Sequence, residues 1–556
     1  MSSQIVDVPD AVHTGLVILD GIGLGVEDVV RLADGAARPV PGTDAMKRVT
    51  ESWDAARRIA ATGRVYGRST GVGANRNEDV PTEAAAEHGL RLLRSHAGAI
   101  GDELPARQVR AMLAVRANQL LAGGAGLRPT VVTALCEALA NGAYPVVNEF
   151  GSVGTGDIAA LAQVGLALVG EHPWLASGTC ADAGGPSGGL GEKAFGRSTA
   201  AHGSAAAGAA GSVAVGATGF TAVDAPGSAA VGAPDPQILD NNDALAFISS
   251  NALTLGQSAL ALHELRALVE ATQVVAALSL LAVDGSHEAY AAPVHAARPH
   301  RGSTEVARRM RWLIGAADRP TPPLGRIQDP YGFRCLPQIH GPAHDAADAL
   351  EKVLDVEINA AAENPLISPE DMAAYHHGGF YQAQLALALD HFRLSLMQVA
   401  RLSTSRLSTL NEPAFTRLRP FLADHEPAAS GVMILEYAAG AALGDLRAFS
   451  APASLGHAVL SRGVEEQASF ASLAARQTLR ACRAYRLVVG CELVAAVRAL
   501  RQRDFRPDPE LPVGRALRLA ESVLARDQAD RPLTDDVTAA AALLDRFPGI
   551  WRGSES

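Results

Sequence analysis

Residues 151–162 read Gly-Ser-Val-Gly-Thr-Gly-Asp-Ile-Ala-Ala-Leu-Ala. Glycines at 151, 154 and 156 allow the backbone to kink, because glycine tolerates conformations that other residues avoid. Thr155 places a hydroxyl group between two of these glycines. The segment therefore predicts a kinked loop that presents a hydroxyl side chain.

The composition of the whole chain favours helices. The chain has 556 residues, a length that predicts more than one domain. Ala and Leu dominate over the Val, Ile and Thr that favour sheets, and aromatic residues make up only 4%. The formal net charge of −11 argues against general binding to nucleic acid or to an anionic membrane, because both need a basic surface. We expect a mainly α-helical protein with no nucleic-acid or membrane partner.

Apolar spacing of three and four residues predicts a succession of helices. In the N-terminal part, a short strand at Leu16–Leu19 and a break at Pro39–Pro41 precede helices at 82–100, 105–122 and 129–142. Long runs rich in Ala and Leu cover 242–284, 342–363, 382–411 and 453–503. These runs would suit a bundle of long helices.

The chain is expected to have three parts. They are an N-terminal domain over 1–240, a central long-helix bundle over 241–505 and a C-terminal helical tail over 506–556. From about 175 to 235 the composition shifts to Gly, Ala and Ser, which predicts a flexible insertion that buries little apolar surface.

Cysteine spacing and apolar segments indicate the cellular compartment in which the protein is expected. The five cysteines form no Cys-x-x-Cys pair and no zinc-like spacing, so reduced thiols in a cytoplasm are expected. No signal peptide is expected at the N-terminus. The most apolar windows, such as 271–284, are predicted to be too short to span a bilayer.

His376 and His377 have no further His or carboxylate residues that would complete a metal shell, so no metal site is expected.

Three segments together resemble those of the histidine and aromatic amino-acid ammonia-lyases. Residues 151–162 are similar to the family's Gly-Ser-Val-Gly-Ala-Ser-Gly-Asp-Leu-Ala-Pro-Leu-Ala. Residues 66–73, Tyr-Gly-Arg-Ser-Thr-Gly-Val-Gly, resemble its Tyr-Gly-Val-Asn-Thr-Gly-Phe-Gly. Residues 328–341, Gln-Asp-Pro-Tyr-Gly-Phe-Arg-Cys-Leu-Pro-Gln-Ile-His-Gly, resemble its Gln-Asp-x-Tyr-Ser-Leu-Arg-Cys-x-Pro-Gln-Val-x-Gly. The likeness covers roughly residues 15–170 and 240–480.

The resemblance implies a fold, an assembly and an activity. The fold is the long-helix bundle of the ammonia-lyase and aspartase-like group, with a mixed N-terminal domain. Such proteins are homotetramers whose active sites combine loops from three subunits. The implied reaction removes ammonia from histidine or another L-amino acid with an aromatic or polar ring, and gives an α,β-unsaturated acid.

In the family, the loop that matches residues 151–162 builds its own electrophile. Its Ala-Ser-Gly cyclises and loses water to give a methylidene-imidazolone ring. Alignment on Asp157 places Gly154, Thr155 and Gly156 in these three positions. The chemistry needs the amide nitrogen of Gly156 and the β-hydroxyl of Thr155, and both are present. A ring of this type, formed by the chain itself, is the expected prosthetic group.

The other candidate residues take their roles from the resemblance. Tyr66 matches the base that removes the β-proton, and Arg334 matches the clamp on the substrate carboxylate, a task that suits a planar guanidinium. A tyrosine can serve as this base only if nearby positive charge lowers its pKa from about 10. Tyr331 matches a tyrosine near the electrophile, Gln338 would orient it, and Phe380 matches a phenylalanine beside it.

Two residues favour a substrate with a polar ring. His96, within Ser-His-Ala-Gly, resembles the histidine-specific branch, although a hydrogen-bonded helical histidine with no such role would look the same. Glu465, within Val-Glu-Glu-Gln-Ala-Ser-Phe, aligns with the family's Gln-Glu-Asp-His-Val-Ser-Met, whose Glu faces imidazole in histidine lyases. Paired acids at 465 and 466 are also typical of a solvated helix face. A site built for a hydrogen bond strongly rejects analogues that lack it.

The departures from the family pattern gather at the reacting centre. The electrophile loop is one residue shorter and carries Thr155 in place of Ser, which would leave a bulkier ethylidene ring. Residues 247–254, Phe-Ile-Ser-Ser-Asn-Ala-Leu-Thr, replace Leu-Ile-Asn-Gly-Thr, so Ser249 occupies the position of an Asn that contacts substrate. Asn251 would replace that Asn only if the local register moves, because residues two apart on a helix face nearly opposite ways. Gly379 and Tyr381 replace the Asn and His around Phe380.

Alternatives follow from these departures. An aminomutase on the same scaffold differs only in whether ammonia returns to the substrate. A divergent homologue without the electrophile would be non-catalytic or would use different chemistry. An aspartase- or fumarase-like lyase would need no such electrophile, but the quoted segments belong to the other branch.

Overall fold

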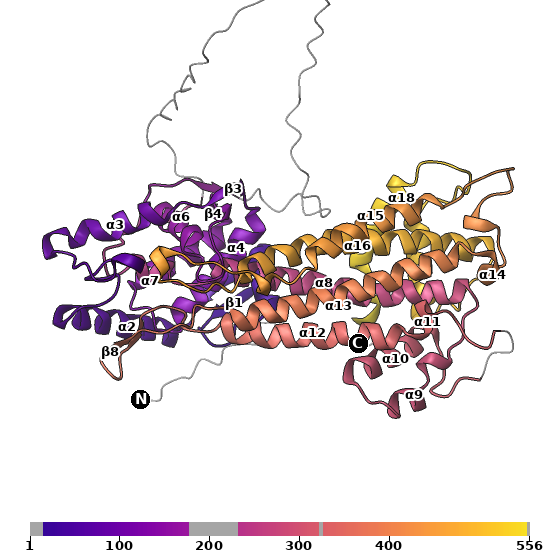
Figure 1. The fold of residues 1–556 in the computed structure, drawn as a ribbon, viewed down its shortest axis with the longest axis horizontal. Coiled ribbons are helices and arrows are strands. Elements are labelled where there is room, and N and C mark those ends of the chain that lie inside the picture. The colour runs from indigo at the N-terminus through magenta and orange to yellow at the C-terminus, as the bar shows by residue number, and fades with distance from the viewer. Residues whose placement is uncertain (1–14, 177–231, 322–325, 553–556) are drawn as a thin grey trace, which may run out of the picture.

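The computed structural model describes residues 15–176, 232–321 and 326–552. Figure 1 shows an N-terminal part at one end of an elongated molecule, with long helices running from it to the other end. One hydrophobic core extends through both, from Val17 to Phe547. The predicted insertion at about 175–235 lies almost entirely outside the described residues, as does Cys180. The division into three domains stays a prediction.

The N-terminal part begins with a small parallel sheet. β1 (Leu16–Leu19) pairs with β2 (Arg38–Pro41), and α1 (Val26–Ala33) connects them. The predicted strand is confirmed, but the interpretation of Pro39–Pro41 as a break is wrong, because these residues form β2. Proline is tolerated there because a two-stranded sheet consists of edge strands.

Five helices and three short strand pairs complete this part. The helices are α2 (Thr43–Thr62), α3 (Ala85–His96), α4 (Ala106–Leu121), α5 (Pro129–Asn141) and α6 (Ile158–Leu168). The antiparallel pairs are β3 (Ile100–Glu103) with β5 (Asn148–Phe150), β4 (Ala143–Pro145) with β6 (Trp174–Ala176), and β7 (Leu366–Ser368) with β8 (Ala373–Tyr375). α4 and α5 begin beside prolines, where a missing N–H costs little.

The bundle consists of long helices that lie side by side (Figure 1). They are α8 (Ala252–Ala282), α12 (Leu336–Glu357), α13 (Ala383–Leu410), α15 (Ile434–Phe449) and α16 (Ala471–Gln502). α16 packs against α8, α13 and α15. α4 of the N-terminal part packs closely on α8, since a side chain at Gly256 would come within 2.9 Å of the Ala111 backbone.

Shorter helices surround the bundle. They are α9 (Ala292–Ala296), α10 (Arg301–Ile314), α11 (Tyr331–Arg334), α14 (Pro413–Thr416), α17 (Pro512–Val523), α18 (Thr534–Leu543) and α19 (Pro548–Arg552). Single 3-10 turns are η2 (Gly73–Asn75), η3 (Thr82–Ala84), η4 (Glu288–Tyr290), η5 (Pro420–Leu422), η6 (Ala453–Leu455), η7 (Ser461–Gly463) and η8 (Leu544–Arg546). The predicted mainly α fold is confirmed.

Three predicted helices have different bounds. The run 342–363 is shifted by six residues, to α12 at Leu336–Glu357. The run 242–284 is broken at residues 249–251 into α7 (Ala244–Ile248) and α8. The run 453–503 becomes helical only at Ala471, because the chain before it has positive φ at Ser461, Arg462 and Phe470. Left-handed backbone of this kind cannot continue an α-helix. Both irregular segments belong to the site described below.

The expectation that no apolar stretch is long enough to cross a membrane is wrong by length. Ala244–Ala282 has a mean hydropathy of 1.5 over its most apolar window. Of that window, 78% is buried inside the protein. A helix that is apolar all round and buried is also typical of the core of a large protein, and α8 has that place here.

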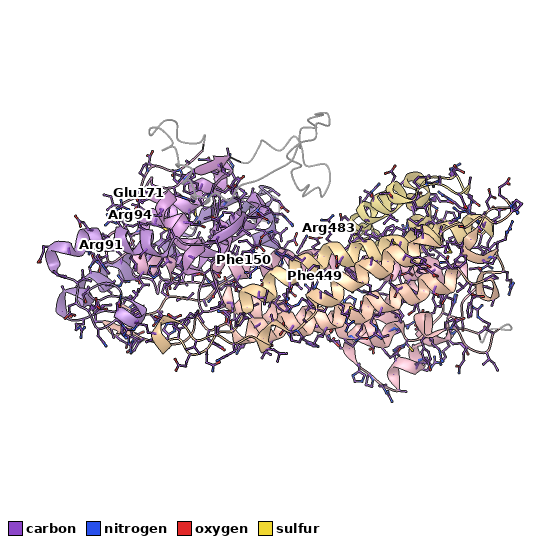
Figure 2. The ribbon with its side chains drawn as sticks, turned by 45° about the horizontal axis from the view of Figure 1, so that its top comes forward. Arg91, Arg94, Phe150, Glu171, Phe449 and Arg483 are labelled. Atoms are coloured by element: carbon purple, nitrogen blue, oxygen red, sulfur yellow. The ribbon has the colours of Figure 1, made fainter. Side chains whose placement is uncertain are left out.

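An exposed ion pair joins α3 to the turn after α6. The guanidinium of Arg94 donates to both carboxylate oxygens of Glu171, at 2.7 and 2.6 Å. Figure 2 shows the two labelled side by side on the N-terminal part. Their side chains are 54% and 34% exposed, so the pair contributes little to stability.

Candidate active site

A cavity of about 620 Å³ lies where five irregular segments meet. Two are the loops at 66–76 and 154–158, the third includes the break after α7, and the others are 364–381 and 464–467. The lining residues are Tyr66, Gly73, Arg76, Thr155, Gly156, Ile158, Leu245, Ser249, Ser250, Asn364, His376, Gly378, Phe380, Tyr381, Val464, Glu465, Glu466 and Gln467. The cavity therefore brings together six of the predicted site residues: Tyr66, Thr155, Gly156, Ser249, Phe380 and Glu465.

Tyr66 is positioned by its own glycine-rich loop. Its hydroxyl oxygen accepts a hydrogen bond of 2.8 Å from the backbone N–H of Gly73. Its ring meets that of His376 edge-on, with centroids 6.2 Å apart. Burial is the main cause that raises the pKa of Tyr66, and the charge of Glu465 adds to it. The Gly73 hydrogen bond and Arg76 act in the opposite direction but do not outweigh burial. The expected lowering of this pKa is therefore not found within one chain.

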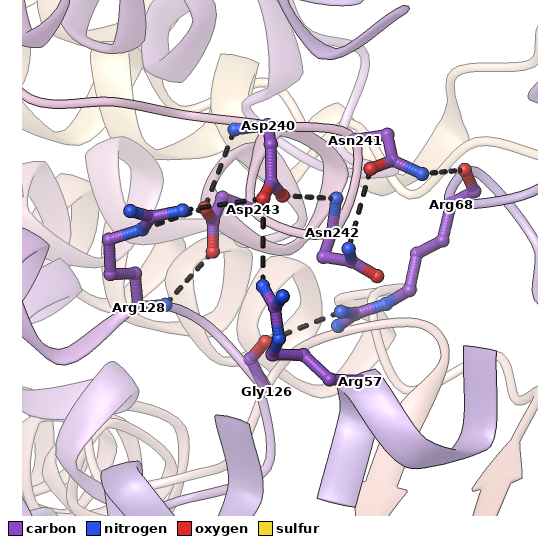
Figure 3. A network of polar contacts seen from close by, with 8 residues as sticks. All are labelled: Arg57, Arg68, Gly126, Arg128, Asp240, Asn241, Asn242 and Asp243. Carbon is purple, nitrogen blue, oxygen red and sulfur yellow. Dashed lines mark hydrogen bonds and ion pairs between the residues drawn. The ribbon is translucent and has the colours of Figure 1, made fainter. Parts of the chain in front are cut away.

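A polar network fastens the glycine-rich loop that begins at Tyr66 to the segment before α7 (Figure 3). The side chain of Asn241 donates to the Arg68 carbonyl oxygen at 2.6 Å, and the Arg68 guanidinium donates to the Gly126 carbonyl oxygen at 3.3 Å. Arg128 in turn forms an ion pair with the buried Asp243. Because Arg68 follows Tyr66 by two residues, this network limits the movement of the tyrosine.

The electrophile loop is tightly bent and docked onto the start of α16. Gly154 and Gly156 have φ of +89° and +120°, a region that side chains other than glycine rarely adopt. The carbonyl oxygen of Gly154 accepts a hydrogen bond of 2.6 Å from the Ser469 hydroxyl. Thr155 is half-buried in the cavity wall. The groups that ring formation needs are all present: the Gly156 amide, the Gly154 carbonyl and the Thr155 hydroxyl.

Asp157 fixes the other end of this loop. Its buried carboxylate accepts hydrogen bonds from the Thr254 N–H and hydroxyl, at 2.7 and 2.9 Å. Burial is the first cause that raises the pKa of this carboxyl, and the bonds from Thr254 oppose it. The loop is thus held between α8 and the start of α16.

The structure distinguishes Ser249 from Asn251. Ser249 lines the cavity, and its hydroxyl oxygen accepts a 3.0 Å hydrogen bond from the Asn364 N–H. Asn251 is buried behind the wall and donates to the Phe380 carbonyl oxygen at 2.9 Å. Residues 249–251 are not helical, so the expected opposite facing of Ser249 and Asn251 on a helix does not apply. Asn251 therefore supports the segment that carries Phe380.

Glu465 lies on a loop, so its interpretation as part of a solvated helix face is wrong. The backbone of Glu465 pairs with that of Leu460 in an isolated bridge. Four successive residues, 464–467, line the cavity, and the charge of Glu465 acts on Tyr66.

Six predicted site residues do not line the cavity within one chain: Gly154 and Asn251, described above, and the four that follow. His96 ends α3, where its ring lies 2.9 Å from the Leu92 carbonyl oxygen, as a hydrogen-bonded helical histidine would. Tyr331 and Arg334 form α11, at the far end of the bundle from α7 (Figure 1), and Gln338 follows in α12. The Arg334 guanidinium lies over the Tyr331 ring at 4.5 Å, and Tyr331 is 66% exposed.

Sequence reasoning did not assign Arg76, His376 or Gln467 to the site. Arg76 ends the glycine-rich loop and is the one lysine or arginine among the cavity-lining residues that the structure describes. A charged residue that ends a glycine-rich loop is the pattern that could have identified it. The described residues contain no group of three or more His, Cys, Asp or Glu that could hold a metal ion.

The chain is similar to known proteins in both sequence and fold. Residues 24–522 match the family described as aromatic amino acid lyase. The histidine ammonia-lyase of Geobacillus kaustophilus is 31% identical over 486 residues, which are 86% of this chain and 87% of that protein. The histidine ammonia-lyase of Caldanaerobacter subterraneus subsp. tengcongensis is 30% identical over 491 residues, 88% of each chain.

Solved structures share the whole fold. Histidine ammonia-lyase from Trypanosoma cruzi has a TM-score of 0.80 at 25% identity, and the match covers 97% of this chain and 95% of that one. Tyrosine aminomutase from Streptomyces globisporus has a TM-score of 0.81 at 23% identity, with coverage of 97% and 98%. The fold is thus that of the helical lyases and aminomutases of the aspartase-like group. The chain belongs to the aromatic amino acid lyase family.

Proposed function

We propose that this protein eliminates ammonia from histidine, or from another L-amino acid with an aromatic or polar ring, to give the α,β-unsaturated acid. The observation that carries the proposal is the cavity that gathers Tyr66, Thr155, Phe380 and Glu465 from four distant segments. Its volume of about 620 Å³ is in the range of pockets for small molecules.

Tyr66 is the proposed base. Its hydroxyl group lies in the cavity wall, fixed by the Gly73 N–H, where it can take the β-proton of a bound amino acid. An aliphatic C–H is weakly acidic, so the reaction needs the phenolate form. Arg76 lines the same cavity and favours that form, while burial disfavours it.

The loop Gly154-Thr155-Gly156 is the proposed source of a methylidene-imidazolone-type prosthetic group. Two glycines with positive φ and a carbonyl bound by Ser469 fit the cyclisation. Thr155 supplies the hydroxyl that must leave during ring formation. Its position in the wall would direct the finished ring into the cavity. Such a ring supplies an electrophilic carbon that makes the amine a better leaving group.

Arg334, Tyr331 and Gln338 are proposed to complete the cavity of a neighbouring copy. They lie in α11 and at the start of α12, and α11 is at the far end of the bundle from α7 (Figure 1). Tyr331 and Gln338 are exposed. Because an antiparallel neighbour would bring this end beside the cavity, we propose a homotetramer with shared sites. Arg334 would then bind the substrate carboxylate in a bidentate manner and add positive charge near Tyr66.

Glu465 is proposed to select the substrate ring. It lies on the cavity wall close enough to Tyr66 for its charge to raise the tyrosine's pKa. A carboxylate in that place can accept a hydrogen bond from an imidazole N–H, which a phenyl ring lacks. Substrates without a ring donor would leave this carboxylate unpaired and be disfavoured.

The test is a substrate screen on the purified chain. L-histidine, L-tyrosine and L-phenylalanine are supplied separately, with release of ammonia and ultraviolet absorbance of the conjugated acid as readouts. We expect release from at least one and the highest kcat/KM with L-histidine. A β-amino acid product would show an aminomutase instead, and no reaction with any of the three would contradict the proposal.

A further inference from the structure

Three successive carbonyl groups of the electrophile loop point to the beginning of α16. The Ser152 carbonyl oxygen accepts from the Ser472 hydroxyl at 2.8 Å, and that of Val153 from the Phe470 N–H at 2.8 Å. That of Gly154 accepts from the Ser469 hydroxyl at 2.6 Å. Docking this loop to one helix end therefore involves both backbone and side-chain donors.

The Ser469 hydroxyl is polarised as well as buried. The side chain is 4% exposed, and its oxygen accepts a 3.3 Å hydrogen bond from the Ala471 N–H, the first residue of α16. A helix of 32 residues places partial positive charge at this end. A hydroxyl that accepts from such an N–H becomes a stronger donor to its own acceptor, the Gly154 carbonyl.

The contact between Ser469 and Gly154 leaves no room for a side chain at position 154. A Cβ at Gly154 would lie 2.3 Å from the Ser469 oxygen and 2.7 Å from the backbone nitrogens of Phe470 and Ala471. Glycine therefore allows the carbonyl to approach the serine closely. The hydrogen bond is a built feature of the loop, because both the missing side chain and the helix start are needed for it.

We propose that Ser469 acts in the formation of the prosthetic group, by stabilising the negative charge that develops on the Gly154 carbonyl oxygen during ring closure. This inference rests on the proposed function, in which Gly154-Thr155-Gly156 forms that group. Preorganised donors aimed at an oxygen that gains charge are the usual means by which proteins promote attack on a carbonyl. Ser469 would have this role once in the life of each chain.

The reaction is balanced by the loss of two waters and needs no oxidant. The Gly156 nitrogen bonds to the Gly154 carbonyl carbon, and its proton passes to the carbonyl oxygen, which becomes a hydroxyl. That hydroxyl leaves as water with the Thr155 amide proton, which creates a carbon–nitrogen double bond. A second water forms from the Thr155 β-hydroxyl and its α-proton, leaving a carbon–carbon double bond.

Ser472 provides a matched control within the same contact. It is also a buried serine, 4% exposed, and it also donates to a carbonyl of the loop. Its acceptor is Ser152, whose carbonyl is not attacked. Ser469→Ala and Ser472→Ala therefore each remove one hydroxyl that docks the loop, but only the first removes a donor to the reacting oxygen. Ser469→Thr keeps a hydroxyl at 469 and serves as the rescue variant.

The experiment follows the intact mass of freshly purified protein with time, and digestion locates any change to the peptide that holds Gly154–Gly156. We expect the wild type, Ser472→Ala and Ser469→Thr to become lighter by two waters. Loss of one oxyanion donor slows comparable reactions about 100- to 1,000-fold, so Ser469→Ala should stay largely unmodified over the same period. Circular dichroism and thermal melting establish that each variant is folded.

The possible outcomes distinguish the proposed role of Ser469 from the proposed function of the protein. If Ser469→Ala loses two waters as fast as the wild type, the role of Ser469 is excluded while the electrophile and the proposed function stand. If both alanine variants are slowed equally, docking of the loop matters and the specific role of Ser469 is again excluded. If the wild type itself keeps its full mass, the ring does not form, which contradicts this inference and the electrophile of the proposed function together.

Discussion

At the scale of single residues, the proposed function depends most on Tyr66, the proposed base. Its hydroxyl group is fixed by the Gly73 N–H, and Glu465 lies close enough for its charge to act on it. Burial and that negative charge favour the neutral phenol, whereas the reaction needs the phenolate. The balance between burial and Glu465 on one side and the Gly73 hydrogen bond and Arg76 on the other sets the amount of phenolate, and burial is the largest of these effects.

This balance predicts a rise in activity toward alkaline pH. The pKa of Tyr66 lies above its ordinary value of 10, so the phenolate fraction within one chain grows throughout the neutral and mildly alkaline range. We expect kcat/KM to increase with pH there. The range from about pH 7 to 9 lies below the usual tyrosine pKa of about 10. A pH–rate profile that falls over this range would contradict the assignment of Tyr66 as the base.

Glu465→Gln tests both the base and the specificity. Removing the carboxylate charge lowers the pKa of Tyr66, so the alkaline rise should move to lower pH. Loss of a charged hydrogen bond is worth about 1.5 to 3 kcal/mol, which is a roughly 10- to 100-fold loss of kcat/KM for L-histidine. The loss for L-phenylalanine should be smaller.

Glu466→Gln is the matched control for this variant. Glu466 lines the same cavity but is not among the charges that act on Tyr66. Its removal should leave the pH profile in place. Equal shifts in the two variants would mean that the charge of the segment matters and that Glu465 has no special contact.

At the scale of elements, buried polar contacts join the helices that shape the cavity. The Arg116 guanidinium in α4 donates to the Phe247 carbonyl oxygen of α7 at 2.9 Å and to the Glu363 carboxylate at 2.8 Å. Both charged side chains are almost completely buried. Glu363 precedes Asn364, which lines the cavity and donates to Ser249. This pair therefore ties two walls of the site together.

Glu363→Ala is expected to destabilise the protein strongly. It would leave the Arg116 charge buried without its partner, a change that typically costs about 3 to 5 kcal/mol. Glu171→Ala breaks the exposed pair with Arg94 and should cost at most about 1 kcal/mol. Thermal or denaturant unfolding of the two variants provides the comparison, and equal destabilisation would be the contrary result.

The elements also show where sequence patterns are insufficient. Composition located the cores of the long helices, because runs rich in Ala and Leu favour helix even where a helix such as α8 is buried all round. It did not locate the break at 249–251 or the late start of α16 at Ala471. Those interruptions follow from tertiary contacts, such as the Asn251 bond to Phe380 and the Ser469 bond to Gly154. The composition of a segment does not reveal which distant residues will contact it in the fold.

At the scale of the whole molecule, motifs identified the family and the fold, and they identified six of the residues that line one cavity. They did not reveal that α11, which carries Arg334, lies at the far end of the bundle from α7 (Figure 1), whose Leu245 lines the same cavity as Tyr66. Sequence order contains no direct information on that separation. For His96, the alternative was a helical histidine that is hydrogen-bonded within its own helix. The structure shows this arrangement, and His96 is not among the residues that line the cavity.

Shared sites predict complementation between inactive subunits. Tyr66→Phe and Arg334→Ala should each abolish most activity when present in every subunit. In a mixed oligomer, some cavities would receive an intact Tyr66 from one chain and an intact Arg334 from another. We expect co-expression of the two variants to restore a fraction of the wild-type kcat. Activity no higher than that of either variant alone would contradict a site shared between chains.

The proposed reaction of the whole molecule is ammonia elimination at the cavity formed by Tyr66 and the Gly154–Gly156 loop. Ammonia release from L-histidine, measured for the wild type beside Tyr66→Phe and Thr155→Ala, tests it most directly. Tyr66→Phe removes the base and Thr155→Ala removes the hydroxyl that must leave during ring formation, so both should lose nearly all turnover while remaining folded. Turnover by either variant at the wild-type rate would contradict the account.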